Sequence, residues 1–166
     1  MKAIGQNPKL CVYPDAGFCN LSDGVSSTQG FVILLEGSLN STVIDWGSRK
    51  IKRKVSSTIE AETLSLKETT NNAIYIGCLL SEFLFDDFTN NRIPVQVFTD
   101  NKPLEQSIRS TKQVQERRLR VDIGEVQRLI EEKEIGDIKW IPSEDMLGDG
   151  LTKRDKNCEK LRKFLI

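Results

Sequence analysis

Short apolar runs separated by polar turns dominate the first half of the chain and return near its C-terminal end. Runs of about four to eight residues bounded by glycine, proline or acidic residues are typical of buried strands. Gly37 and Ser38 separate two such runs and indicate a hairpin turn. The strands predicted in this way cover residues 10–15, 30–36, 39–46, 93–99 and 137–141.

The longest stretch with helical spacing follows this hairpin. One of residues 56–58 can cap its start, and its apolar positions continue to about Phe85. A second helix is predicted over roughly residues 114–133, and a final helical stretch begins at 142–143. Strands followed by helices that lead back to further strands predict an α/β fold, with a five-stranded mixed sheet flanked by helices.

The length of the chain sets the number of domains. Its 166 residues are enough for one well-cored domain and too few for two of ordinary size. We therefore expect a single domain over residues 1–166, with residues 1–9 as an N-terminal extension and residues 154–166 as a C-terminal tail or helix.

Charge and apolar content restrict the partners. Lys and Arg number 24, as do Asp and Glu, so a nucleic-acid partner must be held by local basic patches. The chain has no run of about 18 apolar residues and no signal-peptide pattern, so we expect an intracellular protein without a membrane partner. Its four cysteines lack CxxC spacing, which favours reduced thiols.

The chain contains no histidine. This absence excludes Ser-His-Asp and Cys-His catalysis, as well as HExxH metal sites. A hydrolase with this composition would have to rely on carboxylates and a hard cation.

Three acidic residues are predicted to converge. Glu62 lies on the apolar face of the long helix, where a lone carboxylate is costly, while Glu60 points to the opposite side. Asp15 and Asp100 each close a strand, and the ends of neighbouring parallel strands lie about 4.8 Å apart. Ligands of open α/β sheets bind beyond such ends. Three crowded carboxylates raise each other's pKa, and Mg²⁺ or Mn²⁺ would relieve the repulsion.

Each acid also has a more ordinary interpretation. An Asp at a strand end is often a turn former or a helix cap, and Glu62 could pair with a lysine. Taken singly these interpretations are the better ones. The placement of all three acids together favours a metal cluster.

The chain resembles the ribonuclease H domain of copia-type LTR-retrotransposon polyproteins. The resemblance extends from about Leu10 to Lys153, with an SST-x-EAE block at the start of the long helix and a closing P-[ST]-x-x-x-x-x-D-x-LTK block. The stretches that carry it are Val12–Ala16, Ser56–Leu66, Phe98–Asn101 and Ile141–Lys153.

The resemblance implies hydrolysis of the RNA strand of RNA–DNA hybrids during reverse transcription, with an adjoining reverse transcriptase domain in a cytoplasmic retrotransposon particle. It implies that Asp15, Glu62, Asp100 and Asp149 hold two Mg²⁺ ions, for which Mn²⁺ can substitute. One ion would generate the attacking hydroxide and the other would stabilise the leaving 3′ oxygen, so that cleavage leaves 5′-phosphate ends. The motif leaves Glu60 and Glu62 open, and the helical phase selects Glu62.

The chain departs from the family at two points. Many relatives have a histidine shortly before the fourth acid, which assists product release or proton transfer. Here either Ser143, Glu144 or Asp145 would partly substitute for it, or that step would be slow. Asp149 lies between two glycines, where related domains usually have alanine or a larger residue.

Substrate contacts are predicted at the start of the long helix and in the basic run before it. Ser57 and Thr58 could hold a phosphate through hydroxyl and backbone donors. The run at residues 48–54, which taken alone is typical of a solvated connection, would add salt-sensitive attraction. The basic candidates are Lys50, Lys52, Arg53 and Lys54, with a second patch at Arg117, Arg118 and Arg120.

Two other functions stay open. The domain could be a scaffold or hybrid-binding module whose catalysis is weakened or lost, as the missing histidine and the paired glycines suggest. It could also be a DNA transferase or nuclease of the same fold, such as an integrase core, although the LTK block disfavours this.

Overall fold

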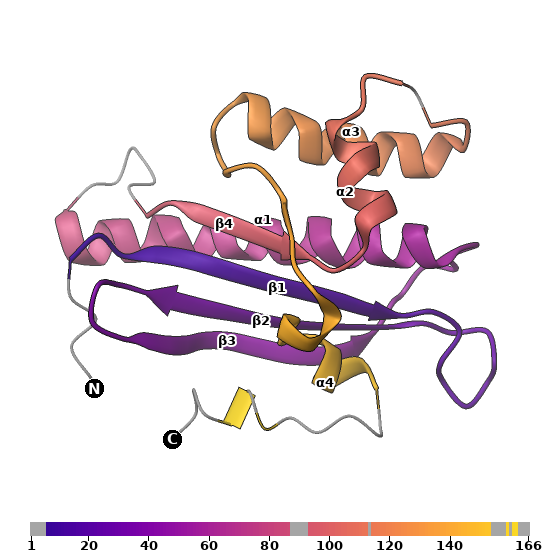
Figure 1. The fold of residues 1–166 in the computed structure, drawn as a ribbon, viewed down its shortest axis with the longest axis horizontal. Helices are drawn as coiled ribbons and strands as arrows, with labels where there is room; N and C mark the ends of the chain where they lie inside the picture. The colour runs from indigo at the N-terminus through magenta and orange to yellow at the C-terminus, as the bar shows by residue number, and fades with distance from the viewer. Residues whose placement is uncertain (1–5, 87–92, 113, 154–158, 160, 163–166) are drawn as a thin grey trace.

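The computed structural model describes residues 6–86, 93–112, 114–153, 159 and 161–162. The rest of the predicted N-terminal extension and C-terminal tail therefore lies outside the described residues. Five strands form one mixed sheet in the order β3-β2-β1-β4-β5. Figure 1 shows β3, β2, β1 and β4 side by side in this order. These strands are β1 (Lys9–Gly17), β2 (Thr28–Glu36), β3 (Ser41–Lys50), β4 (Val95–Thr99) and β5 (Lys139–Trp140).

The first three strands form an antiparallel meander, and the last two run parallel to β1. The predicted five-stranded mixed sheet is thus confirmed. The predicted parallel pairing of the first and fourth strands is also present, because the long helix returns the chain to the same end of the sheet.

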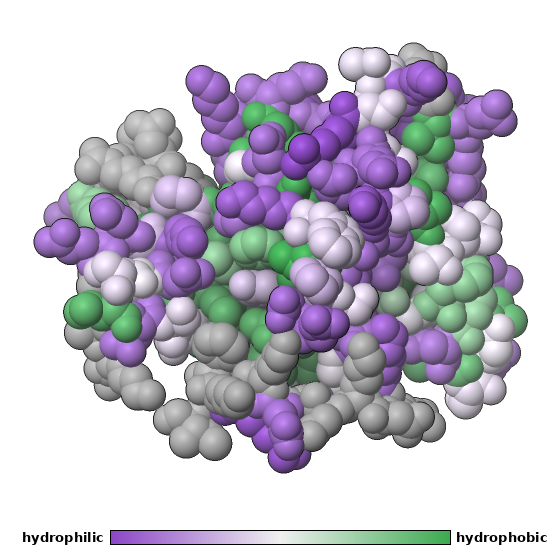
Figure 2. All heavy atoms as spheres, viewed as in Figure 1, coloured by the Kyte–Doolittle hydropathy of each residue, from purple (hydrophilic) through white to green (hydrophobic). Residues whose placement is uncertain are grey.

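Helices cover both faces of the sheet, as Figure 1 shows. Helix α1 (Thr58–Phe85) runs along one face, with α2 (Lys102–Arg109) and α3 (Arg117–Glu131) beside it. The short η1 (Ser143–Asp145) and α4 (Asp149–Thr152) lie on the other face. Figure 2 shows hydrophilic side chains gathered over α2 and α3. Within the part of the chain that the structure describes, no helix is both long and apolar enough to cross a membrane.

The central strands are buried on both faces. Leu10, Val12 and Ile33 belong to the core beneath α1. On the other face, Cys11 and Leu34 pack with Leu147 and Leu151 of the closing segment, which runs from Pro142 to Lys153. A strand with two covered faces needs apolar residues at consecutive positions rather than at alternating ones. This requirement explains the uninterrupted apolar runs of β1 and β2.

Several element boundaries differ from the predicted ones. β1 continues through Pro14 to Gly17, because its ladder with β4 ends at Val12 and the missing proline N–H removes no bond on that side. β3 begins at Ser41 and extends to Lys50, so part of the basic run belongs to a strand. Helix α2 was not predicted separately, although Asn101 caps it by accepting a hydrogen bond from the Leu104 N–H at 3.0 Å.

Candidate metal centre

The carboxyl ends of β1 and β4 bring together three predicted site residues. Asp15 lies in the buried C-terminal part of β1, Asp100 directly follows β4, and Glu62 lies in the second turn of α1. Each residue offers one carboxylate oxygen such that these oxygens all lie within 4.8 Å of one another. Asp15 and Glu62 are buried, while Asp100 is partly exposed.

Backbone contacts hold this corner of the fold together. The Ser65 hydroxyl of α1 donates to the main-chain oxygen of Asp15 at 2.8 Å, and the Ala16 N–H donates to the Glu62 carboxylate. Gly148 crosses β1 so closely that a side chain would meet the Tyr13 carbonyl oxygen at 2.6 Å. The first of the two paired glycines is therefore required by this close approach.

The three carboxylates are electrostatically crowded. Burial raises the pKa of the Asp15 carboxyl to about 6, and the charges of Asp149 and Asp100 add to the rise. Burial raises the pKa of Glu62 well above its usual range, and the charges of Asp15 and Asp100 again contribute. A donor set made only of carboxylate oxygens suits a hard divalent cation, which would offset this repulsion. The cluster therefore fits Mg²⁺ or Mn²⁺ by its chemistry.

The fourth predicted acid is oriented differently. Asp149 is buried at the start of α4, and its carboxylate forms an ion pair with Lys153, four residues later. It does not belong to the group of three, although its charge raises the pKa of Asp15. The Lys153 ammonium group lies near enough to lower the pKa of Asp15 and of Glu62.

Two hydroxyl groups of the closing segment contact the strand-end acids. Thr152 Oγ1 donates to Asp15 Oδ2, and Ser143 Oγ donates to Asp100 Oδ2 at 2.6 Å. The indole N–H of Trp140 donates to the main-chain oxygen of Asp100 at 3.1 Å. Thr152 and Trp140 were not predicted as site residues, because contacts between distant segments leave no local pattern in the sequence.

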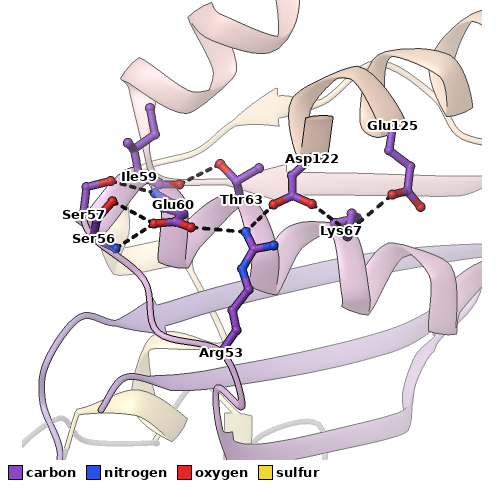
Figure 3. Close-up of polar contacts among 9 residues, drawn as sticks. All are labelled: Arg53, Ser56, Ser57, Ile59, Glu60, Thr63, Lys67, Asp122 and Glu125. Carbon is purple, nitrogen blue, oxygen red and sulfur yellow. Dashed lines mark hydrogen bonds and ion pairs between the residues drawn. The ribbon is translucent and has the colours of Figure 1, made fainter. Parts of the chain in front are cut away.

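Glu60 points away from the cluster, as the helical phase predicts, but it is 1% exposed. Its carboxylate accepts hydrogen bonds from Ser56 N at 2.6 Å and Ser56 Oγ at 2.9 Å, and it pairs with Arg53 at 3.3 Å (Figure 3). Its own N–H donates to the Ser57 hydroxyl, which caps α1. These contacts fix the first turn of the helix that carries Glu62.

The same network joins α1 to α3. The buried Asp122 accepts from both Arg53 and Lys67, and Lys67 also pairs with Glu125 at 3.3 Å (Figure 3). The Arg53 side chain is 34% exposed, and its guanidinium group is held by two acids. The role of Arg53 in this structure is thus to link elements.

Two grooves are lined by some of the other predicted substrate residues, namely Thr58 in one and Lys54, Arg117 and Arg118 in the other. Ser57, besides capping α1, precedes Thr58, which lines a groove of about 840 Å³ together with Glu62 and Lys153. Lys50 forms an exposed pair with Asp23, and Lys52 is exposed. A second groove of about 410 Å³ lies between the chain before α1 and the start of α3, and three of its lining residues are Lys54, Arg117 and Arg118.

No family model matches the chain, and no curated protein is similar to it in sequence. Several solved structures are similar in fold. The N-terminal RNase H domain of Rv2228c from Mycobacterium tuberculosis has a TM-score of 0.61 at 16% identity, covering 95% of this chain and 99% of that one. RNase H1 from the halophilic archaeon Halobacterium salinarum has a TM-score of 0.58 at 16% identity, covering 86% and 93%.

A third similar structure is LC11-RNase H1 in complex with an RNA/DNA hybrid, with a TM-score of 0.58 at 16% identity, covering 93% of this chain and 99% of that one. Together with the strand order, these likenesses define the class of the protein. It is an α/β domain with the ribonuclease H-like fold, as predicted.

Proposed function

We propose that the protein is a divalent-metal-dependent endonuclease that hydrolyses the RNA strand of RNA–DNA hybrids and leaves 5′-phosphate ends. The observation that carries the proposal is the convergence of Asp15, Glu62 and Asp100 within 4.8 Å at the carboxyl ends of two parallel strands. The ribonuclease H-like fold and the hybrid-bound structure of LC11-RNase H1 support the choice of substrate.

In this proposal Asp15, Glu62 and Asp100 would hold the metal, and Asp15 is the most buried of the three. Two Mg²⁺ ions, when bound, would supply activation of the attacking water and stabilisation of the leaving oxygen. Asp149 would act as the fourth ligand after releasing Lys153, with which it pairs. The freed ammonium group would then face the groove and could contact a substrate phosphate.

The proposed substrate surface follows from the two grooves. Thr58 and the capped start of α1 provide backbone donors beside Glu62, which suit a phosphate of the hybrid. Lys52, Lys54, Arg117 and Arg118 provide the positive charge nearby. Recognition would use backbone and 2′-hydroxyl contacts, so we expect little sequence specificity.

We further propose that this activity serves reverse transcription in a copia-type retrotransposon particle, beside an adjoining reverse transcriptase domain. The motif blocks at Ser56–Leu66 and Ile141–Lys153 support this context.

Cleavage of a labelled RNA–DNA hybrid in Mg²⁺ tests the proposal. We expect the wild-type protein to cut the RNA strand and Asp100→Asn to lose the activity while keeping the fold, because the amide is isosteric and Asp100 is only partly buried. Asp137→Asn is the matched control, since Asp137 is an exposed acid outside the cluster. Full activity of Asp100→Asn would contradict the site assignment.

One observation favours a second candidate, a hybrid-binding domain with weakened or lost catalysis. The fourth acid is paired with Lys153 rather than joined to the other three. If the wild-type protein binds the hybrid but does not cleave it in Mg²⁺ or Mn²⁺, this second function replaces the first.

A further inference from the structure

The closing segment from Pro142 to Lys153 crosses the ends of β1 and β4 and contacts an acid on each. Thr152 Oγ1 donates to Asp15 Oδ2, and Ser143 Oγ donates to Asp100 Oδ2 at 2.6 Å. The metal cluster thus receives one hydroxyl donor on each strand-end carboxylate. Thr152 is the threonine of the LTK block, and these contacts show what it does in the fold.

Thr152 is held firmly in this position. It is 6% exposed, and its main-chain oxygen accepts a hydrogen bond from Asn20 Nδ2 at 2.9 Å. Its methyl group lies so close to Gly30 that a side chain at Gly30 would meet it at 2.8 Å. The side chain therefore has little freedom to turn its hydroxyl away from Asp15.

Ser143 lies on the surface, but its neighbours fix the segment that carries it. The Ile141 N–H donates to the Thr99 oxygen at 2.9 Å, and the Trp140 indole donates to the Asp100 oxygen at 3.1 Å. The main chain and the carboxylate of Asp100 are thus both held from the β5–η1 segment. This arrangement matters most for Asp100 because it is the least buried of the three acids.

A hydroxyl donor on one carboxylate oxygen limits rotation of the group and leaves lone pairs of both oxygens available for a cation. Hydrogen bonds of this kind orient metal-binding carboxylates. We propose that Thr152 and Ser143 are positioning residues that orient Asp15 and Asp100 for divalent-cation binding. This inference rests on the proposed function, because it requires that the cluster binds a metal.

Calorimetric titration of the metal-free protein with Mn²⁺, followed by Mg²⁺, tests the inference. Thr152→Val and Ser143→Ala each remove a hydroxyl, and we expect each to weaken Mn²⁺ affinity by about 10–100-fold. Thr152→Ser and Ser143→Thr retain the hydroxyl and are expected to restore most of the affinity. Ser107→Ala is the control, since the Ser107 hydroxyl donates to the Pro103 oxygen within α2.

The outcomes separate this inference from the proposed function. Wild-type affinity in Thr152→Val and Ser143→Ala would overturn the positioning role while leaving the metal site intact. A wild-type protein that binds neither Mn²⁺ nor Mg²⁺ would overturn both. Urea unfolding in EDTA reports whether each variant is folded, and the exposed Ser143 provides a substitution that leaves the core untouched.

Discussion

At Asp15, burial and the neighbouring acids of the carboxylate cluster raise the free energy of the ionised side chain. Asp15 is 2% exposed, and burial together with the nearby acids raises the pKa of its carboxyl group to about 6 from 3.8. A carboxyl group with a raised folded-state pKa contributes stability that is fully present below the unfolded-state pKa. That contribution is lost as the pH rises through about 6.

Asp15→Asn should therefore stabilise the metal-free protein at pH 7.5. We expect a gain on the order of 1–3 kcal/mol in the free energy of unfolding. The gain fades towards pH 4, where Asp15 is protonated in the folded state and about half protonated in the unfolded state. Urea unfolding in EDTA at the two pH values measures this difference. Equal stability of the variant and the wild type at pH 7.5 would show that the cluster is not strained without metal.

A second acid, Asp23, provides a control in which the same substitution should change the stability in the opposite direction. Asp23 is exposed in the β1–β2 loop, and hydrogen bonds from Ser26 and Val25 lower its pKa. Asp23→Asn should lose stability at neutral pH, because the stabilisation by an ionised acid with a lowered pKa is present there. The two substitutions make the same chemical change, so the opposite signs isolate the effect of the environment.

The helical phase was sufficient to select Glu62, but it could not reveal how Glu60 is buried. The partners of Glu60 come from the preceding chain, and Asp122, which shares Arg53 with it, comes from α3. Such long-range pairs leave no local pattern. The Asp149–Lys153 pair does have a local signal, because acid and base are four residues apart. That spacing could have indicated that the fourth acid is paired.

At the scale of elements, the strands and the long helix were predictable because their apolar runs reflect burial. Helix α2 was missed because it has only two buried residues, Leu104 and Ile108, although Asn101 and Pro103 are ordinary signals of a helix start. The ion-pair contact between α1 and α3 was not predictable, because Arg53 and Lys67 are far from Asp122 in the sequence (Figure 3).

Removing Arg53 from that contact should destabilise the protein. Arg53→Met leaves two nearly buried acids without their shared cation, since the side chains of Glu60 and Asp122 are only 2% and 4% exposed. We expect a loss of about 2–4 kcal/mol, below the full cost of breaking a buried pair because Arg53 is itself partly exposed. Urea unfolding measures the loss.

Arg128→Met is the matched control for this substitution. Arg128 pairs with Glu132 on the surface of α3, where both side chains are about half exposed. Removal of such a pair should change stability by less than about 1 kcal/mol. Similar losses in the two variants would show that the α1–α3 network is no stronger than a surface ion pair.

At the scale of the whole molecule, the sequence could predict that β1 and β4 are parallel neighbours, because a helical crossover separates them. It could not predict the path of the closing segment. That path depends on close contacts between distant residues, such as Gly148 against Tyr13 and Thr152 against Gly30. These contacts determine where the hydroxyl donors of the site lie. The donors were therefore less predictable from the sequence than the three acids.

The absence of net charge on the whole molecule makes the distribution of charge decisive for hybrid binding. Lys54, Arg117 and Arg118 share one groove, whereas Lys9 begins β1 at the end of the strand away from Asp15 and pairs with Glu36. Each lysine or arginine that neutralises a phosphate steepens the dependence of the binding constant on salt by about one unit in a double-logarithmic plot. Position should therefore matter more than the number of charges.

A double variant, Lys54→Ala with Arg117→Ala, should reduce the salt-dependence slope by about two and weaken hybrid binding at low salt. The double variant and the protein with which it is compared both carry Asp100→Asn. Lys9→Ala should leave the slope unchanged, although it removes the same kind of charge. Fluorescence anisotropy of a labelled hybrid across a KCl series measures both. Counterion release reports contact with phosphates rather than the mere presence of charge. An unchanged slope in the double variant would therefore place the hybrid away from the groove between the chain before α1 and the start of α3.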